Sequence, residues 1–485
     1  MFDAVIIGCG VVGAAAAYEL SKYDMRVCVL EAENDVAMGT SRANSAIIHA
    51  GYDPPCGTLM ARLNVRGNAL TEELCRGLDV PFKRIGSLVL AFSEAERTHI
   101  TELYERGIQN GVPGLRIVER DELLKMEPNV NSNVVCALHA PTAGIVNPWE
   151  LTLALIETAV KNGAELHLNS RVTAIEATGG GYRVTVSGGE SFETKYIFNA
   201  AGVYSDEVHE LVGEKEFTIT PVRGQYYLLD KSQGGMAGHV LFQCPSPDGK
   251  GVLISPTVHG NLIVGPNFER QEDRSDVGTT GQGLEYVAGT AKKTCSRIDF
   301  RENIRNFAGI RASAEIDDFI IGESRTARGF FNLAGIKSPG LSAAPAIGEM
   351  AAELLSSAGF ELKPKKDFDG SRRIIRFNTL SEAEKARLVS EHPEYGRVIC
   401  RCETVTEGEI RQCFHGPVPP RSIAGVKRRT GAGMGRCQGG FCSPKVCQII
   451  ADELGCPPWE VQEDMEGSRI LTGPTKTGRS AYDDI

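Results

Sequence analysis

Four cysteines in the last hundred residues have the spacing of a thiolate site. Cys400 and Cys402 stand in RVICRCETV, and Cys437 and Cys442 stand in GMGRCQGGFCSP. Zinc ribbons more often carry two CxxC pairs, and disulfide oxidoreductases need CxxC near a strand–helix junction. The CxC and CxxxxC pairs therefore leave three interpretations open: an iron–sulfur cluster, a zinc ion, or free thiols.

A fifth cysteine makes the ligand set ambiguous, because Cys447 follows Cys442 by five residues. The segment SPKVCQIIADEL predicts a helix, with Ser443 as its cap and Pro444 at its first position. Helical spacing puts Val446, Ile449, Ile450 and Leu454 on a buried face. Cys447 then lies inside the helix, whereas residues 438–441 form an open loop. We expect the core or surface thiols to be Cys413, Cys447 and Cys456.

The opening of the chain predicts a nucleotide-binding βαβ unit. FDAVIIGCGVVGAAAAYELSKYDMRVCVLEAE contains a buried strand, the GxGxxG turn of Gly8, Gly10 and Gly13, a helix and a second strand that ends at Glu31. The glycines permit a tight turn, close approach of a pyrophosphate and close helix packing. Unpaired N–H groups at the helix start suit phosphate, and Glu31 suits the ribose hydroxyls of an adenosine.

Three further segments favour a flavin over a nicotinamide as the bound nucleotide. They are GTSRANSAIIHAGY, YIFNAAGVYSDEV and FFNLAGIKSPGLSAAPAIGEMAAELL. In the second, Ala200, Ala201 and Gly202 leave room for a flat ring or a phosphate. The third predicts a strand, a turn at residues 337–340 and an alanine-rich helix whose small side chains permit close packing. The positive end of that helix would stabilise a reduced, anionic isoalloxazine.

With these motifs, the first ~365 residues resemble the FAD-dependent oxidoreductases of the D-amino-acid oxidase type. They are most similar to glycerol-3-phosphate and L-2-hydroxyglutarate dehydrogenases, through GCGVVG, NSAIIHAG, TAGIVNP, NAAGVYSD, TPVRGQYYLL, FAGIR and GIKSPGLSAAPAIG. The cysteine region resembles the two-iron, two-sulfur module of bacterioferritin-associated ferredoxin, which is also appended to the anaerobic type of glycerol-3-phosphate dehydrogenase.

The resemblance implies an α/β FAD-binding Rossmann-like domain with an inserted α+β substrate domain, followed by a small helical iron–sulfur domain. We expect the oxidoreductase region at residues 1–365, a linker at 366–395 with a short helix in SEAEKARLV, the cluster domain at 396–460 and a polar tail at 461–485. Within the first region, the FAD domain is predicted at about 1–80, 145–215 and 305–365, and the substrate domain at about 81–144 and 216–304.

Three side chains are candidates for catalysis. His49 is suited to accept a hydroxyl proton, and Arg311 is suited to pair with a phosphate or carboxylate. Lys337 could bind the same anion or tune the flavin. The structural alternatives are a core histidine for His49, an ion pair that only stabilises the fold for Arg311, and a solvent-exposed turn residue for Lys337. The residues expected to contact FAD are Gly8, Gly10, Gly13, Glu31, Thr40, Ser41, Ser45, Val172, Ala201, Gly202, Gly309, Lys337, Ser338, Gly340, Leu341 and Ser342; the expected cluster ligands are Cys400, Cys402, Cys437 and Cys442.

These assignments predict an FAD-dependent dehydrogenase for a small anionic 2-hydroxy compound. The most favoured substrate is sn-glycerol 3-phosphate, oxidised to dihydroxyacetone phosphate, with electrons leaving through the cluster to an acceptor protein or a further flavoprotein subunit. The alternatives are L-2-hydroxyglutarate, another 2-hydroxy or amino acid, and a non-catalytic electron-transfer subunit.

Composition limits the remaining classes of function. The 485 residues carry a formal net charge of −10, which disfavours a general nucleic-acid binder. There is no apolar run of ~20 residues and no basic leader before AVIIG, so we expect a cytoplasmic protein that meets a membrane only through a partner. A basic group, Arg421, Lys427, Arg428, Arg429 and Arg436, would raise a cluster's potential, dock a partner or form a solvated face.

Overall fold

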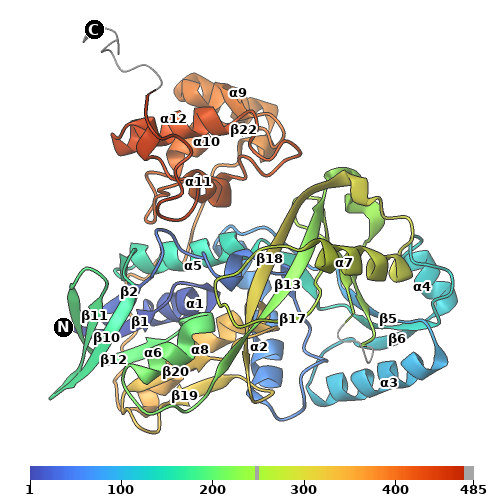
Figure 1. Cartoon of the computed structure of the whole chain (residues 1–485), viewed down its shortest axis with the longest axis horizontal. Helices are drawn as coiled ribbons and strands as arrows, with labels where there is room; N and C mark the ends of the chain where they lie inside the picture. The colour runs from blue at the N-terminus through green and yellow to red at the C-terminus, as the bar shows by residue number, and fades with distance from the viewer. Residues whose placement is uncertain (246–250, 475–485) are drawn as a thin grey trace, which may run out of the picture. The chain divides into compact units, whose positions relative to one another are not determined.

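The computed structural model describes residues 1–245 and 251–474, which form two compact units. Residues 1–32 and 36–373 make the first unit, and residues 33–35 and 374–485 make the second (Figure 1). None of the helices in the described ranges is both long enough and apolar enough to cross a bilayer.

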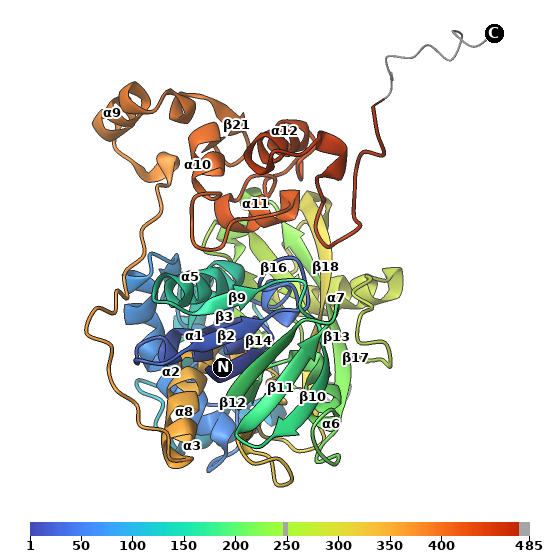
Figure 2. The same cartoon turned by 90° about the vertical axis from the view of Figure 1, so that its left-hand side faces the viewer.

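The first sheet of the first unit contains the predicted nucleotide-binding strands. β1 pairs in parallel with β2 on one side and β12 on the other, and β1 is almost entirely buried, as its apolar sequence predicts. β20 extends the sheet beside β12 (Figure 1). β10 and β11 complete an antiparallel edge next to β12 (Figure 2). The eight strands are β1 (Phe2–Ile7), β2 (Val27–Leu30), β9 (Glu165–His167), β10 (Val172–Thr178), β11 (Gly181–Val186), β12 (Ser191–Asn199), β19 (Ile320–Glu323) and β20 (Phe330–Ala334).

Glycines let the helices beside this sheet approach closely. A Cβ on Gly348 of α8 would lie 2.6 Å from the carbonyl oxygen of Ala15 in α1, and a Cβ on Gly67 of α2 would lie 2.0 Å from that of Ser342. The close packing predicted for the alanine-rich helix is therefore confirmed. The helices of the unit are α1 (Val11–Leu20), α2 (Leu59–Gly77), α3 (Glu94–Gln109), α4 (Arg120–Met126), α5 (Pro148–Lys161), α6 (Ser205–Glu210), α7 (Gly281–Thr294) and α8 (Gly340–Ser357).

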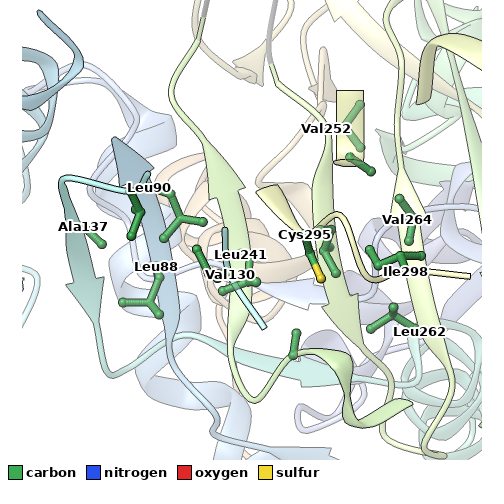
Figure 3. Packing of buried hydrophobic residues seen from close by; sticks show 14 of the residues in the cluster. Leu88, Leu90, Val130, Ala137, Leu241, Val252, Leu262, Val264, Cys295 and Ile298 are labelled. Carbon is green, nitrogen blue, oxygen red and sulfur yellow. The ribbon is translucent and has the colours of Figure 1, made fainter. Parts of the chain in front are cut away.

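A second, nine-stranded sheet carries its own hydrophobic core, which includes Leu88, Leu90, Leu241 and Val264 (Figure 3). β18 runs antiparallel to β13 along almost its whole length, so residues 305–314, which we expected in the FAD domain, extend this sheet. The strands are β5 (Ser87–Ala91), β6 (Arg116–Glu119), β7 (Cys136–Ala140), β13 (Ile219–Leu229), β14 (Val240–Gln243), β15 (Leu253–Pro256), β16 (Leu262–Gly265), β17 (Glu269–Arg270) and β18 (Asn303–Ala314).

Short elements join these layers. A small sheet is formed by β3 (Ile47–Ile48), β8 (Gly144–Val146) and β4 (Phe82–Lys83). Two 3-10 turns lie in segments predicted to contact FAD: η1 (Thr40–Arg42) and η2 (Gly202–Tyr204). The other 3-10 turns of the chain are η3 (Lys231–Met236), η4 (Phe300–Glu302), η5 (Phe377–Thr379), η6 (Pro393–Gly396) and η7 (Pro458–Glu460).

The second unit is mostly helical. The helix predicted in SEAEKARLV is present as α9, which begins with a capping box between Ser381 and Glu384. Gln462 and Glu463, inside the predicted polar tail, accept backbone hydrogen bonds from Ile423 and Ala424 and belong to the folded unit. The last part of the predicted tail, residues 475–485, lies outside the described residues. The regular elements are α9 (Glu382–Glu391), β21 (Val398–Cys400), β22 (Val405–Thr406), α10 (Glu407–Gln412), α11 (Ile423–Thr430) and α12 (Ser443–Leu454).

The helix after the cysteine loop differs from its prediction at both ends. Cys442 occupies the cap position and Ser443 is the first helical residue, so Ser443 is not the cap. Val446, Ile449 and Ile450 are buried as expected, and Cys447 lies inside the helix. Leu454 is 44% exposed, because the helix ends there and Gly455 turns the chain away with a left-handed φ.

Candidate functional site

The turn between β1 and α1 has the backbone that phosphate binding needs. Gly8 has φ +96°, and a Cβ there would lie 2.6 Å from the carbonyl oxygen of Ala200. A Cβ on Gly13 would lie 2.0 Å from the carbonyl oxygen of Gly8. Only glycine fits at both positions, and the turn leaves a smooth backbone surface at the start of α1, which suits a pyrophosphate.

Two predicted FAD residues lie beside this turn. Glu31, at the end of β2, is buried, and its carboxylate accepts a hydrogen bond from the Cys9 N–H at 2.6 Å. Ser41 Oγ accepts from the Val11 N–H at 2.8 Å, at the first position of α1. The structure therefore brings Glu31 and Ser41 to the phosphate turn from separate segments of the chain.

The segment around η1 links the first sheet's turn to the long strands of the second sheet. Thr40 Oγ1 donates to the carbonyl oxygen of Ile310 at 2.5 Å, and Ser45 Oγ lies 3.4 Å from the Tyr226 hydroxyl. A Cβ on Gly309 would lie 1.8 Å from the carbonyl oxygen of Ala43, so β18 can lie against this segment only with glycine there. Three predicted FAD residues, Thr40, Ser45 and Gly309, thus come together.

His49 is half-buried and held on several sides. Its Nε2 lies 3.3 Å from Ser338 Oγ, and its backbone N–H donates to Ser342 Oγ at 2.6 Å. The imidazole stacks on Phe242, with ring centroids 5.6 Å apart. The Asn68 amide donates to the His49 carbonyl oxygen at 3.0 Å. The structure therefore joins His49 to the start of α8 and adds Phe242 and Asn68, which the sequence did not indicate.

Arg311 lies flat across the neighbouring strand β13. A Cβ on Gly224 would lie 2.7 Å from Arg311 Nη2 and 3.1 Å from its Cζ, and the same Cβ would lie 2.8 Å from Pro266. Within residues 1–245 and 251–474, no group forms a hydrogen bond or an ion pair with this half-buried guanidinium. A partly buried arginine without an acidic partner is arranged to receive an anion.

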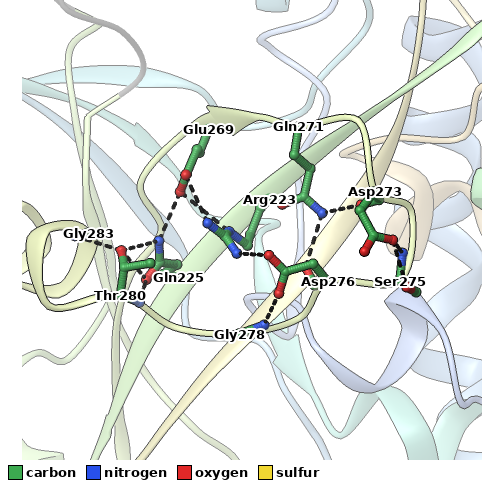
Figure 4. A network of polar contacts seen from close by, with 10 residues as sticks. All are labelled: Arg223, Gln225, Glu269, Gln271, Asp273, Ser275, Asp276, Gly278, Thr280 and Gly283. Atoms are coloured by element: carbon green, nitrogen blue, oxygen red, sulfur yellow. Dashed lines mark hydrogen bonds and ion pairs between the residues drawn. The ribbon is translucent and has the colours of Figure 1, made fainter.

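The other face of β13 at this point is tied to a surface loop. Arg223 is buried and forms ion pairs with Glu269 at 2.8 Å and Asp276 at 2.6 Å, as Figure 4 shows. Gln225 accepts from the Thr280 N–H at 2.7 Å. Because side chains alternate along a strand, these contacts hold β13 from the face opposite Arg311. The sequence did not indicate this network, since its partners are 44–55 residues apart.

Lys337 is engaged by an acidic side chain. Its Nζ donates to Asp317 at 2.6 Å, so its predicted contact with a substrate anion stays a prediction. Leu341 and Gly340 lie at the start of α8, and Gly202 has φ +60° with open space where a Cβ would point. Of the three remaining predicted FAD residues, Gly10 caps α1, where a Cβ would lie 3.2 Å from Ser41 Oγ, and Val172 and Ala201 pack against the core of the first sheet.

The four predicted cluster ligands converge as two pairs of thiols. Cys402 Sγ lies 3.6 Å from Cys437 Sγ, and Cys400 lies near enough to Cys442 to raise the pKa of its thiol. No group of three or more described His, Cys, Asp or Glu side chains is arranged to hold a single metal ion. Two thiol pairs suit a centre of two iron atoms, whose four ligands are all cysteine thiolates.

The loop around Cys437 already favours its thiolate. Backbone N–H groups of Phe441, Gly439 and Gly440 point at the sulfur, and the Phe441 N–H contributes most to lowering the Cys437 pKa below its ordinary value. Burial, followed by the nearby Cys400, raises the pKa of Cys442 to about 12. Cys442 therefore needs a bound cation to lose its proton at neutral pH.

The basic group near the cysteines is partly structural. Arg428 and Arg429 are buried, and both form ion pairs with the buried Asp35 at 2.8 Å. Arg428 also pairs with Asp464 at 2.9 Å. These two guanidinium groups hold the second unit together, and neither is part of a solvated face.

Comparison with known proteins agrees with both sites. Residues 3–354 match the family model of FAD dependent oxidoreductases, and residues 398–452 match that of BFD-like [2Fe-2S] binding domains. The chain therefore belongs to the FAD-dependent oxidoreductase family and carries a C-terminal 2Fe-2S domain. This confirms the resemblance, the fold class, and FAD and a 2Fe-2S cluster as cofactors.

Similarity to individual proteins indicates which type of FAD-dependent oxidoreductase this is. The chain is 50% identical to a glycerol 3-phosphate dehydrogenase of Caloramator mitchellensis over 98% of this chain and 99% of that protein. It is 34% identical to a glycerol 3-phosphate oxidase of Mycoplasma genitalium over 73% of this chain and 94% of that one. An FAD-bound L-alpha-glycerophosphate oxidase structure from Mycoplasma pneumoniae superposes with TM-score 0.73 at 32% identity, covering 77% of this chain and 99% of that chain. The protein is thus an enzyme of the glycerol-3-phosphate dehydrogenase-like type.

Proposed function

We propose that the protein oxidises sn-glycerol 3-phosphate to dihydroxyacetone phosphate and passes the electrons through its 2Fe-2S domain to a partner protein. The observation that carries the substrate side of this proposal is Arg311, a half-buried cation with no acidic partner in the described ranges, lying against Gly224. The full-length dehydrogenase relative supports glycerol 3-phosphate as the anion.

Arg311 is the residue proposed to hold the phosphate. Its planar guanidinium offers two parallel N–H groups to a phosphate or carboxylate, and such charge-assisted pairs are the stronger class of hydrogen bond. Gly224 leaves the space in which the guanidinium lies, and the Arg223 network holds this part of β13 from behind.

His49 is the proposed general base for the substrate hydroxyl. The stacked Phe242 ring and the hydrogen bonds of the His49 backbone fix its position, and Ser338 Oγ stands 3.3 Å from Nε2. When bound, FAD supplies a hydride acceptor. Proton removal by a positioned histidine contributes about 10²- to 10⁴-fold to such a reaction.

The four cysteine thiols are proposed to hold the cluster through the pairs Cys402 with Cys437 and Cys400 with Cys442. When bound, the cluster carries electrons one at a time, which suits an acceptor protein better than direct use of oxygen. We place this reaction in the cytoplasm, with any membrane contact made through the partner.

Anaerobic bleaching of the bound flavin tests the proposal. We expect glycerol 3-phosphate to bleach it rapidly, and L-2-hydroxyglutarate and glycine to do so slowly or not at all. Arg311→Ala should raise KM while FAD stays bound. Arg311→Lys keeps the positive charge but loses the paired N–H groups of the guanidinium, so its KM should lie between those of wild type and Arg311→Ala. Faster bleaching by L-2-hydroxyglutarate would transfer the assignment to the hydroxyglutarate relatives. No bleaching by any of the three would indicate a non-catalytic subunit.

A further inference from the structure

Phe441 is exposed in a way that folding alone does not account for. Its side chain is 84% exposed, more than that of any other large hydrophobic residue in the described ranges. It stands in the loop between two cluster ligands, Cys437 and Cys442. An exposed aromatic side chain next to a functional group is suited to act as the anchor of an interaction site.

The loop that carries Phe441 is ordered by the cysteines. The Gly440 N–H donates to the Cys437 carbonyl oxygen at 2.9 Å, the Val446 N–H donates to the Cys442 carbonyl oxygen at 2.9 Å, and α12 begins two residues after Phe441. Gln438 and Gly439 have positive φ values of 46° and 89°, which turn the chain around the sulfur. The backbone of Phe441 is thus fixed at a cluster ligand while its ring points into solvent.

The four ligands differ in exposure. Cys400 and Cys442 are buried, at 1% and 2% exposed, whereas Cys402 is exposed and Cys437 is half-buried. Phe441 lies in the short loop between Cys437 and Cys442, and Cys437 Sγ is 3.6 Å from Cys402 Sγ, so the exposed ring belongs to the loop that carries one member of the more exposed pair. The cluster site therefore has one edge at the surface, and Phe441 stands at that edge.

The chain segments that make this edge carry excess positive charge. Residues 398–404 and 434–445 contain the cations Arg401, Arg436 and Lys445 and one acid, Glu403. Arg401 and Lys445 are exposed, and no described residue forms an ion pair with either. Exposed cations around an apolar side chain are complementary to a partner protein whose surface has an apolar patch surrounded by carboxylates.

We propose that Phe441, the edge of Cys402, Arg401 and Lys445 form the docking surface for an acidic one-electron carrier protein. The carrier takes one electron from the reduced 2Fe-2S centre, so its own metal centre is reduced as the cluster returns to its oxidised state. This proposal deepens the proposed function, on which it rests for the direction of electron flow.

Binding to two haem proteins of opposite charge tests the surface directly. The probes are the acidic soluble domain of cytochrome b5 and the basic cytochrome c, titrated against oxidised, cluster-loaded enzyme by calorimetry at low ionic strength. We expect the acidic protein to bind more tightly and its Kd to rise as salt is added. Phe441→Ala should raise that Kd at least tenfold, as expected for an aromatic anchor.

Matched variants separate the surface from general effects. Phe268→Ala removes a phenylalanine that is 52% exposed in the first unit, and it should leave the Kd unchanged. Arg401→Glu with Lys445→Glu should weaken binding of the acidic probe and strengthen binding of the basic one, whereas Arg328→Glu, at an exposed site of the first unit, should do neither. Iron and sulfide content and the rate of flavin bleaching by glycerol 3-phosphate should match wild type in all of these variants.

Each contrary result is decisive. Equal affinity of wild type for the two haem proteins, or an unchanged Kd in Phe441→Ala, overturns the docking surface. Loss of phosphatidylglycerol vesicle binding in Phe441→Ala, with haem-protein binding intact, would assign the surface to a lipid and also overturn it. Absent flavin bleaching with haem-protein binding as predicted would refute the proposed substrate and leave the docking surface standing, so the two failures are distinguishable.

Discussion

A single methyl group at Gly224 is expected to displace Arg311. The Cβ of Gly224→Ala would lie 2.7 Å from Arg311 Nη2, whereas ordinary contacts begin at 3.4 Å, so the guanidinium must move by roughly 0.7 Å. A 1 Å misplacement of a positioning group costs about 10²-fold in rate. We therefore expect kcat/KM for glycerol 3-phosphate to fall about 10- to 100-fold, mainly through KM.

The fall in kcat/KM in Gly224→Ala should not exceed the fall in Arg311→Ala, in which the guanidinium is removed. Loss of a charge-assisted hydrogen bond costs about 1.5–3 kcal/mol, which corresponds to about 10- to 150-fold. In Arg311→Ala the added methyl no longer meets the guanidinium and keeps its contact with Pro266 at 2.8 Å, so the double variant should lose less than about threefold beyond Arg311→Ala. The two substitutions are thus expected to be strongly non-additive.

The assay is anaerobic stopped-flow bleaching of the flavin over a range of substrate concentrations in wild type, both single variants and the double variant. Gly289→Ala is the matched control, because a Cβ there meets nothing within 4 Å, and it should leave the kinetics unchanged. If Gly224→Ala costs the same factor with and without Arg311, the methyl acts through something other than the guanidinium and the anion site is misassigned.

Four further changes have defined outcomes. His49→Asn should slow flavin bleaching about 10²- to 10⁴-fold with little change in KM, and a normal rate would remove His49 as the base. Cys437→Ser should lower iron and labile sulfide and stop transfer to a protein acceptor while flavin bleaching persists; unchanged iron would contradict its role as a ligand. Gly13→Ala should be purified without FAD, because its Cβ would lie 2.0 Å from the Gly8 carbonyl oxygen. Retained flavin would show that the turn between β1 and α1 can shift to accommodate the methyl group. Burial, and secondarily His239, lowers the pKa of His139, so the folded state binds fewer protons than the unfolded state. The free energy of unfolding should therefore fall as the pH drops below about 6.5. His139→Asn should reduce this pH dependence in thermal unfolding, and an unchanged pH dependence would mean that other groups cause it.

Local backbone requirements made part of the site predictable. The GxGxxG spacing anticipates the close contacts of Gly8 and Gly13, because these contacts arise within one strand–turn–helix unit. The small residues of α8 likewise anticipated its close packing on α1 and α2. In the second unit, the cysteine spacing and the predicted helix favour Cys437 and Cys442 over Cys447 as ligands; Cys447 lies inside α12, and Cys437 Sγ lies 3.6 Å from Cys402 Sγ.

Contacts between distant segments were not predictable from local patterns. The position of Gly224 under Arg311 depends on the register of β13 and β18, and the stacking of Phe242 on His49 depends on which strand lies beside His49. From the sequence, Arg428 and Arg429 could raise a cluster's potential, dock a partner or form a solvated face. Their shared contact with Asp35, 393 residues from Arg428, has no local signal in the sequence. The ion pair between Lys337 and Asp317 was likewise not predictable, because nothing in the sequence of the turn at Lys337 indicates it.

The most direct test of the central claim is to follow flavin and cluster together in anaerobically purified protein. Addition of glycerol 3-phosphate is predicted to bleach the flavin absorbance and to produce the electron paramagnetic resonance signal of a reduced 2Fe-2S cluster, in protein that contains FAD, iron and labile sulfide. Protein that contains iron and sulfide but shows neither change on addition of glycerol 3-phosphate would contradict the account.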